Sequence, residues 1–187
     1  MTAKIKIGLT GTILSGKSTA LKIFEALGAY TMSSDAIVHE LQSRPAVQKQ
    51  IFKIFKTTDK AEIAAQAFTT PAKRKKLEAL LHPMVMREAS RLVKLTDKKI
   101  IVLEAPVLFE GGVEKYFDII LCMAADEKTL EKRIKSRGMT KKDFAARSAA
   151  QLSGAKKMSR ADIVVYNNGT VKDLEVKIKR LYKILKK

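Results

Sequence analysis

The sequence contains little cysteine and no long apolar run. Its 187 residues include one cysteine, Cys122, which excludes an internal disulfide and a zinc site built from cysteines. No stretch approaches the roughly 18 consecutive apolar residues that a membrane-spanning helix needs. Lys4, Lys6 and Gly8 interrupt any apolar core of an N-terminal signal peptide. We therefore expect a cytoplasmic enzyme or binding protein.

Acidic residues are also few: 19 Asp and Glu stand against 37 Lys and Arg, a formal net charge of +18. That charge favours an anionic partner, whether nucleic acid, a membrane surface or a phosphorylated small molecule. Tryptophan is absent and aromatic residues make up 6% of the chain, so stacking platforms for nucleic acid are not expected. The basic runs at 73–76 and 172–187 are predicted to be solvated helix faces. Small phosphorylated molecules are thus the expected partners, with no nucleic acid and no membrane.

Short apolar runs alternate with helical patterns along the chain, which is typical of a parallel sheet wrapped by helices. The composition, 46% hydrophobic and 30% charged, suits one globular domain. The segment 35–95 has no clear strand and is predicted to be helical, interrupted by Pro45, Pro71 and Pro83. Strands are predicted at 5–9, 29–32, 100–103, 119–123 and 162–166, and helices at 16–27 and 174–185.

The strongest motif is a glycine-rich loop between a predicted strand and a predicted helix. Residues 11–18 read Gly-Thr-Ile-Leu-Ser-Gly-Lys-Ser, which fits the P-loop pattern G-x-x-x-x-G-K-[ST]. Its glycines allow turns in which backbone N–H groups converge on phosphate oxygens, and the helix that follows adds its positive end. Lys17 can reach the outer phosphates, and the Ser18 hydroxyl can bind Mg²⁺. The predicted ATP-binding residues are Gly11, Thr12, Ile13, Leu14, Ser15, Gly16, Lys17, Ser18 and Thr19.

Three carboxylates follow predicted strands, at the edge where a parallel sheet places its reactive crevice. Asp35 comes just after the second strand and either accepts a hydroxyl proton during phosphoryl transfer or caps a helix. Glu104 ends the third strand and either lies near Mg²⁺ and its waters or pairs with a neighbouring lysine. The role of Glu110, six residues after Glu104, is even less defined by the sequence. The residues alone leave these alternatives open.

A strongly basic segment, 128–142, is predicted to close over bound phosphates. Arg133 and Arg137 are four residues apart and share one helix face, where guanidinium groups can stabilise a transferring phosphoryl. The alternative is a solvated helix face. Arg147 is a further candidate, predicted at the start of a second helical stretch that reaches Gln151.

Several short motifs occur in the order found in one enzyme family. Together they resemble the dephospho-coenzyme A kinase family over essentially the whole chain. They are Gly8-Leu9-Thr10 before the P-loop, Asp35-Ala36-Ile37, Leu81-His82-Pro83, Ala105-Pro106-Val107-Leu108-Phe109-Glu110, Arg147 four residues before Gln151, and Ala161-Asp162 through Asn167-Asn168-Gly169.

The resemblance implies a kinase that uses ATP and Mg²⁺ to phosphorylate the 3′-hydroxyl of the dephospho-CoA ribose, giving CoA and ADP. It implies an α/β fold of the P-loop type: a three-layer α/β/α core with a parallel five-stranded sheet, a helical acceptor-binding insertion and a lid. The single domain 1–187 would comprise a core of 1–32, 96–126 and 155–187, an insertion of about 33–95 and a lid of about 127–154. The implied catalytic residues are Asp35, Lys17 and Arg137, the implied acceptor-binding residues are His82, Leu108, Glu110 and Arg147, and the metal ligand is Ser18, with Glu104 as a weaker candidate.

The sequence departs from the family pattern at a few positions. Thr12 and Leu14 replace loop glycines, Ser33 replaces a frequent aspartate, and His39 stands where the family often has arginine. These changes bear on acceptor affinity more than on reaction type, so a kinase for another small acceptor is the near alternative. A basic P-loop protein that binds nucleic acid is the distant one. A monomer is expected, with an oligomer left open.

Overall fold

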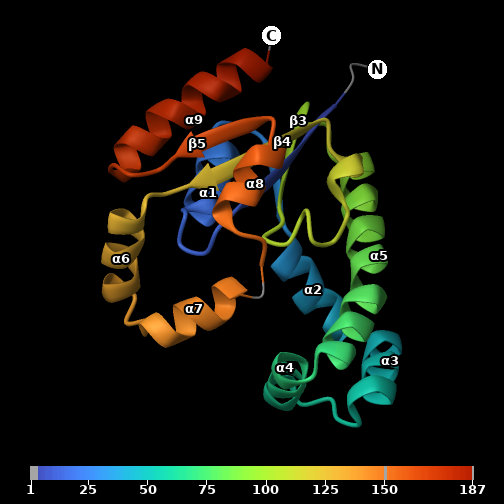
Figure 1. Cartoon of the computed structure of the whole chain (residues 1–187). Coiled ribbons are helices and arrows are strands. Elements are labelled where there is room, and N and C mark those ends of the chain that lie inside the picture. Colours follow the sequence, from blue (N-terminus) through green and yellow to red (C-terminus); the bar gives the residue numbers. More distant parts are fainter. Residues whose placement is uncertain (1–3, 150, 187) are drawn as a thin grey trace. The chain divides into compact units, whose positions relative to one another are not determined.

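The structure is a computed structural model that describes residues 4–149 and 151–186 (Figure 1). The described chain forms two compact units. The first comprises residues up to Ser33 and those from Thr96 on, and it contains a parallel sheet. The second, Ser34–Leu95, is helical.

The sheet of the first unit has five parallel strands in the order β2-β3-β1-β4-β5, which confirms the predicted fold class. The register pairs Leu9 of the central strand with Glu104 and Thr10 with Cys122, so three strands end at one edge. The chain moves from one side of the central strand to the other between the third and fourth strands, which makes this edge a topological switch point. The strands are β1 (Ile5–Gly11), β2 (Tyr30–Ser33), β3 (Ile100–Glu104), β4 (Ile119–Ala124) and β5 (Ile163–Tyr166).

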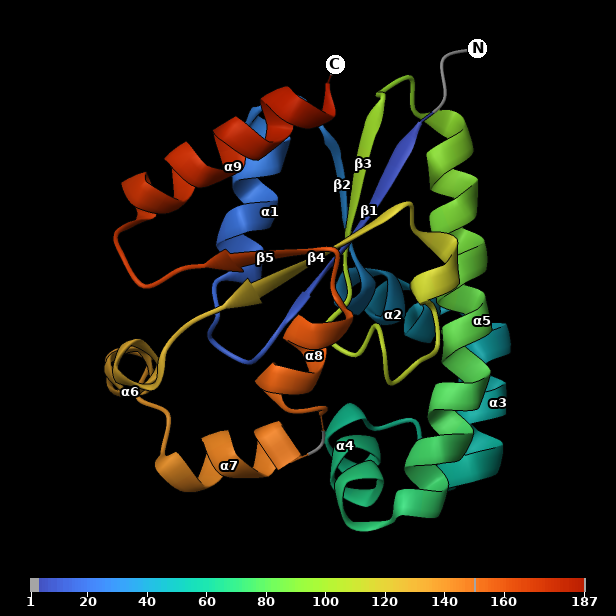
Figure 2. The same ribbon diagram turned by 45° about the horizontal axis from the view of Figure 1, so that its top comes forward.

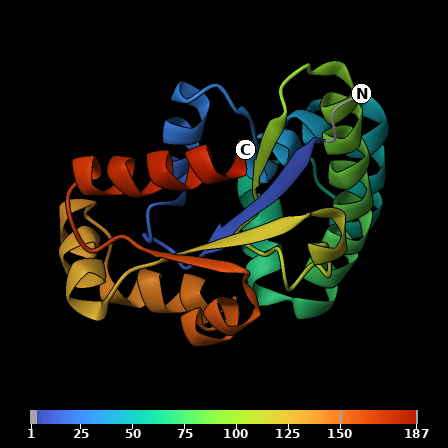
Figure 3. The same cartoon turned by 90° about the horizontal axis from the view of Figure 1, so that it is seen from above.

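Apolar side chains on one sheet face pack against α1 and α9, which lie side by side (Figure 2). Phe24 from α1 and Ile178 from α9 are fully buried there against Ile7 and Val102 of the sheet. Helix α8 lies on the opposite face, so the sheet is the middle layer (Figure 3). The helices of this unit are α1 (Lys17–Ala26), α6 (Glu127–Ser136), α7 (Lys141–Ala149), α8 (Gly154–Arg160) and α9 (Val171–Leu185), with a 3₁₀ turn at Glu114–Tyr116.

Helix α7 lies differently from the sequence prediction. Arg147 is in its last turn, whereas a helical stretch beginning near Arg147 and reaching Gln151 was expected. That prediction is wrong because Thr140 caps the helix earlier: its hydroxyl accepts from the Asp143 N–H at 3.0 Å and donates to the Asp143 carboxylate at 2.6 Å. This reciprocal pairing sets the helix start at Lys141. Residue 150, inside the predicted lid, lies outside the described residues.

The second unit has its own small core around Ile51, Phe55 and Leu81. Pro45 and Pro71 each begin a helix, where a missing N–H costs nothing, while Pro83 lies inside the longest helix. The helices are α2 (Ser34–Ser43), α3 (Pro45–Phe55), α4 (Lys60–Thr69) and α5 (Pro71–Leu95). Among the described residues, no helix of either unit is both long and apolar enough to cross a membrane.

Candidate functional site

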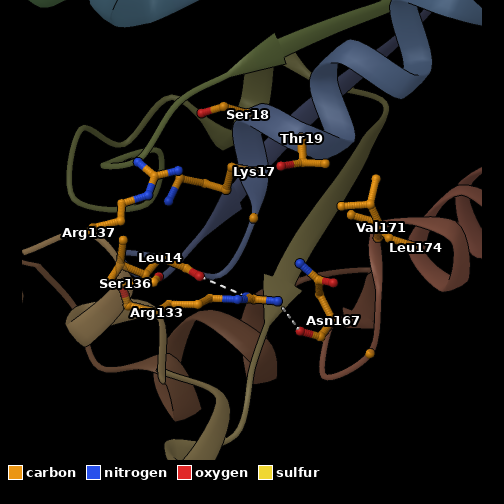
Figure 4. Close-up of a pocket in the computed structure, with 12 residues that line it drawn as sticks. Leu14, Lys17, Ser18, Thr19, Arg133, Ser136, Arg137, Asn167, Val171 and Leu174 are labelled. Atoms are coloured by element: carbon orange, nitrogen blue, oxygen red, sulfur yellow. Dashed lines mark hydrogen bonds between the residues drawn. The ribbon is translucent and has the colours of Figure 1, made fainter. Parts of the chain in front are cut away.

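The first unit holds a cavity of about 320 Å³ beside the loop that joins β1 to α1 (Figure 4). Three segments far apart in the sequence form its wall. The loop and α1 contribute backbone and cationic groups, α6 and its C-cap contribute two arginines, the turn before α9 contributes an amide, and the start of α9 contributes apolar side chains. The lining residues are Leu14, Gly16, Lys17, Ser18, Thr19, Arg133, Ser136, Arg137, Asn167, Gly169, Val171 and Leu174.

Two glycines give the loop its shape. Gly11 and Gly16 have φ angles of 142° and 97°, in the region that side chains disfavour. A Cβ at Gly11 would lie 2.2 Å from the carbonyl oxygen of Met123, and one at Gly16 would lie 2.1 Å from Asn167 Nδ2. Both positions therefore need glycine for conformation and for space.

Lys17 begins α1 and is 8% exposed. Its Nζ donates to the carbonyl oxygens of Gly11 at 3.2 Å and Thr12 at 2.8 Å, so the ammonium lies across the mouth of the loop. The helix cap is Gly16, which has no side chain to bind the first N–H groups. These N–H groups and the ammonium together form an anion-binding concavity.

A hydroxyl and a carboxylate meet at the carboxyl edge of the sheet. Ser18 Oγ donates to Glu104 Oε1 at 3.1 Å, and Glu104 is 8% exposed at the end of β3. Among the described residues no cluster of three His, Cys, Asp or Glu side chains could hold a metal on its own. This pair nevertheless fits Mg²⁺, because Mg²⁺ takes one or two protein oxygens and completes its shell with phosphate oxygens and water.

Arg133 reaches from α6 to two other segments of the site. Its Nη1 donates to the Leu14 carbonyl oxygen and its Nη2 to the Asn167 carbonyl oxygen, both at 2.8 Å (Figure 4). Burial is the main cause that lowers the pKa of the Arg133 guanidinium; Asp126 opposes the shift and nearby Arg137 adds to it. Arg137, the C-cap of α6, is exposed at the cavity wall.

Two asparagines connect the loop, α6 and α9. Asn167 Nδ2 donates to the Ser15 carbonyl oxygen at 2.9 Å, and Asn168 Oδ1 accepts from the Asp126 N–H at 2.9 Å. Asp126 caps α6 by accepting from the Thr129 N–H at 2.8 Å, and the hydrogen bonds from Thr129 lower the pKa of its carboxyl. In the sequence, 167–169 predicts only a turn. The pattern gives no sign that the Asn167 amide is buried beside Gly16 of the loop, so its role in the site was missed.

The predicted acceptor residues after β3 have other neighbours. Leu108 is fully buried in a cluster with Phe109 and Ile120. Glu110 Oε1 accepts from the Leu152 N–H at 2.7 Å and lies 3.1 Å from Nζ of Lys157, a fully buried lysine that sequence reasoning missed. No local sequence pattern distinguishes Lys157 from the exposed lysines around it. It differs from them in its contacts with Pro106 and Glu110, which are distant in the sequence.

The remaining predicted site residues are divided between the two units. Arg147 is exposed in α7 and does not line the cavity. Asp35, in the second unit, is the second residue of α2 and is exposed, so it lies in the first helical turn and is not the cap. Asp35 comes two residues after Ser33. In the parallel pairing of β2 with β3, Ser33 is the register partner of Glu104. His82 is half-buried in α5, and His39 Nε2 lies 3.0 Å from Lys60 Nζ.

Comparisons with known proteins agree with this geometry. The family model of dephospho-CoA kinase matches residues 5–173. The dephospho-CoA kinase of Chlamydia pneumoniae is 33% identical over 195 residues, covering 97% of this chain and 96% of its own. That of Deinococcus radiodurans is 34% identical over 180 residues, covering 91% and 87% of the two chains.

Solved structures share the fold. TT1252 from Thermus thermophilus superposes with a TM-score of 0.87 at 29% identity, covering 98% of this chain and 99% of that one. Shikimate kinase from Bacteroides thetaiotaomicron, at 13% identity and a TM-score of 0.59 over 98% and 99% of the chains, shares the fold alone. Because the family model spans nearly the whole chain, this protein belongs to the dephospho-CoA kinase family.

Proposed function

We propose that this protein transfers the γ-phosphoryl group of ATP to the 3′-hydroxyl of the ribose of dephospho-CoA, giving CoA and ADP. The observation that carries the proposal is the loop of Gly11–Ser18 with Lys17 across its mouth, in a chain that belongs to the dephospho-CoA kinase family. The phosphate-binding groups supply the donor half of the reaction, and the family supplies the acceptor.

The donor half follows from the cavity. The loop N–H groups and the Lys17 ammonium bind the β- and γ-phosphates, while the apolar wall of Val171 and Leu174 is suited to one face of a nucleoside. Arg137, exposed at the same wall, would stabilise charge on the phosphoryl group in transit. A Mg²⁺ held by Ser18 and Glu104 would offset negative charge on the phosphates.

The acceptor half rests on Asp35. In the transfer, the 3′-oxygen forms a bond to the γ-phosphorus, the bond from that phosphorus to the β,γ-bridging oxygen breaks, and ADP leaves. The 3′-hydroxyl proton must go to a base, and Asp35 is our candidate because it lies in the first turn of the helix that directly follows β2. His82, Glu110 and Arg147 are proposed to bind the acceptor. For Leu108, which is buried, we propose that packing supports that region.

The domain roles and the cellular setting are part of the same proposal. We infer a core of 1–32, 96–126 and 155–187, an acceptor-binding insertion of about 33–95 and a lid of about 127–154. We also infer a monomer that acts in the cytoplasm, with no nucleic acid or membrane as partner.

An acceptor panel tests the proposal. Purified protein with ATP and MgCl₂ is given dephospho-CoA, AMP, UMP, CMP or shikimate, and ADP release is measured together with the mass of the product. Turnover with dephospho-CoA and a product carrying one added phosphoryl group is the expected result. Turnover with a nucleotide and none with dephospho-CoA would overturn the acceptor assignment, and omission of Mg²⁺ tests the metal requirement.

A further inference from the structure

Leu14, at the tip of the phosphate-binding loop, has a left-handed backbone conformation with φ of 61°. It is a leucine in a region that glycine enters freely and that other L-residues occupy at a cost. For a leucine the conformation is disfavoured roughly tenfold. The loop tip therefore needs an external contact to keep the shape that the phosphate-binding N–H groups require.

Arg133 provides a contact of this kind. Its Nη1 donates to the carbonyl oxygen of Leu14, and its Nη2 donates to that of Asn167, which lies beyond β5 (Figure 4). Asn167 in turn donates from Nδ2 to the carbonyl oxygen of Ser15, the next peptide of the loop. Two successive peptides of the loop tip are thus held from outside the loop, one by α6 and one by the turn before α9.

The chemistry of arginine suits this role better than that of lysine. A guanidinium presents several N–H donors in a rigid plane, so one side chain can bridge two carbonyl oxygens, whereas an ammonium acts as a point charge on a flexible stem. Arg133 is only partly exposed, and both of its Nη donors are directed at peptide carbonyls of the site. Arg137, the C-cap of α6, lines the same cavity but makes no hydrogen bond to the loop, within the part of the chain that the structure describes.

We infer that Arg133 is a positioning residue of the nucleotide site, which holds the left-handed Leu14 peptide so that the loop is set before a nucleoside triphosphate binds. The inference rests on the proposed function only in taking a nucleoside triphosphate as the ligand. Because α6 carries Arg133, the shape of the loop and the placement of α6 are coupled through this one side chain. The leucine makes the coupling stronger in this chain than a glycine at the same position would.

A double-mutant cycle tests the inference. Arg133→Met, Leu14→Gly and the double variant are compared with the unaltered protein, and the dissociation constant of a non-hydrolysable ATP analogue with Mg²⁺ is measured by calorimetry. In the presence of Leu14, loss of the arginine frees the loop tip to leave its strained conformation. In the Leu14→Gly background the left-handed conformation is intrinsically populated. We therefore expect Arg133→Met to weaken binding about tenfold more with Leu14 present than in the Leu14→Gly background.

Arg137→Met, run through the same cycle with Leu14→Gly, is the matched control. It removes a guanidinium from the same helix and the same cavity, so its effect should be independent of Leu14. Arg133→Lys keeps the charge but cannot bridge both carbonyl oxygens, and it should bind the analogue several-fold more weakly than the unaltered protein. If Arg133→Lys binds the analogue as tightly as the unaltered protein does, Arg133 acts only as a charge and the inference is overturned.

The remaining outcomes are also decisive. Equal losses for Arg133→Met in both backgrounds, within about twofold, would show that Arg133 does not act through Leu14. A lowered melting temperature with an unchanged dissociation constant would indicate a merely structural role and would likewise overturn the inference. If Arg133→Met does not fold, the cycle is run with Arg133→Lys under the same criterion. The binding measurement needs no acceptor. An absence of turnover with dephospho-CoA would therefore overturn the proposed function, while the double-mutant cycle would still test the role of Arg133.

Discussion

Lys157 of α8 and Glu110 of the loop after β3 form an ion pair of 3.1 Å, although the lysine is fully buried. The same ammonium donates to the Pro106 carbonyl oxygen and, at 3.2 Å, to Gln151 Oε1. Three acceptors on two segments thus compensate the burial of one positive charge. Lys157 thereby joins the segment that contains Gln151, between α7 and α8, to the loop that follows β3.

Removal of this lysine should destabilise the protein strongly. Lys157→Met removes the ion pair with Glu110 and leaves the Pro106 carbonyl without its buried donor, and we expect the free energy of unfolding to fall by about 1–3 kcal/mol. Urea denaturation followed by circular dichroism measures the change. The matched control is Lys141→Met, which breaks an exposed pair with Glu131 and should cost about 0–1 kcal/mol. Equal effects of the two variants would contradict the assignment of Lys157 as a buried anchor.

Asp35→Asn should lower kcat by about 10²–10⁴ because the 3′-hydroxyl proton loses its acceptor, while the dissociation constant of an ATP analogue stays unchanged. Steady-state kinetics with dephospho-CoA and calorimetry measure the two quantities. Glu40→Gln, which removes another exposed carboxylate of α2, is the control and should leave kcat within about twofold. A near-normal kcat for Asp35→Asn would leave Asp35 as an acidic residue in a first helical turn, favourable to the helix dipole alone.

Lys17→Ala should reduce kcat by about 10²–10³ or more, because the cation that contacts the outer phosphates in the transition state is lost. Lys22→Ala, the control, removes an exposed lysine from the same helix and should change kcat little. The comparison separates a specific phosphate contact from the general attraction of a chain with a net charge of +18 for anions. Full activity of Lys17→Ala would refute the phosphate-binding role of the loop.

Gly16→Ala should abolish binding of the ATP analogue and lower the melting temperature. The added methyl group would lie 2.1 Å from Asn167 Nδ2, and the residue would have to keep a φ of 97°. Gly138→Ala is the control, since its φ of 62° is also left-handed but no atom of the described residues, its chain neighbours apart, lies within 4 Å of the added carbon. That variant should show the backbone cost alone, about 1 kcal/mol, with normal binding. Normal binding by Gly16→Ala would contradict the packing described at the loop.

Glu88 of the second unit gives a prediction about pH. Hydrogen bonds from Arg91, with Arg44 adding to the effect, lower the pKa of its buried carboxyl from the ordinary value of 4.5. A lowered folded-state pKa means that the unfolded chain binds the proton more readily, so the stabilisation is complete above pH 4.5 and is lost as the pH falls through the folded-state value. Glu88→Gln should therefore lower the urea midpoint at pH 7, and the difference from the unaltered protein should shrink in acid. A difference that grows in acid would contradict this account.

The fold was largely accessible from the sequence, because its determinants are local. Apolar runs such as 100–103 predict buried strands, and all five residues of β3 are buried. The P-loop pattern predicts the phosphate-binding turn, whose glycines have the expected positive φ. The prediction for the helix around Arg147 failed because Thr140, a single capping residue, sets the helix start.

The contacts that complete the site could not be predicted in the same way. Arg133 meets Leu14, Asn167 meets Ser15, and Lys157 meets Pro106, all across long stretches of sequence. No periodicity or spacing encodes such pairs, since they depend on the strand order and on which lysine or amide becomes buried. The roles of Asp35, His82, Arg137 and Arg147 stay predictions, and the Asp35→Asn variant tests the first of them.

The central place of β1 in the sheet has a consequence for how the protein forms during synthesis. Both of its neighbours, β3 and β4, begin at residue 100 or later, so the apolar side chains of Ile5, Ile7 and Leu9 leave the ribosome long before any strand can cover them. At about 5–20 residues per second, this exposure lasts roughly 5–20 s. Pairing over such sequence distances is slow, and an unpaired apolar strand is prone to aggregate. Strand β1 therefore needs protection until β3 and β4 have been made.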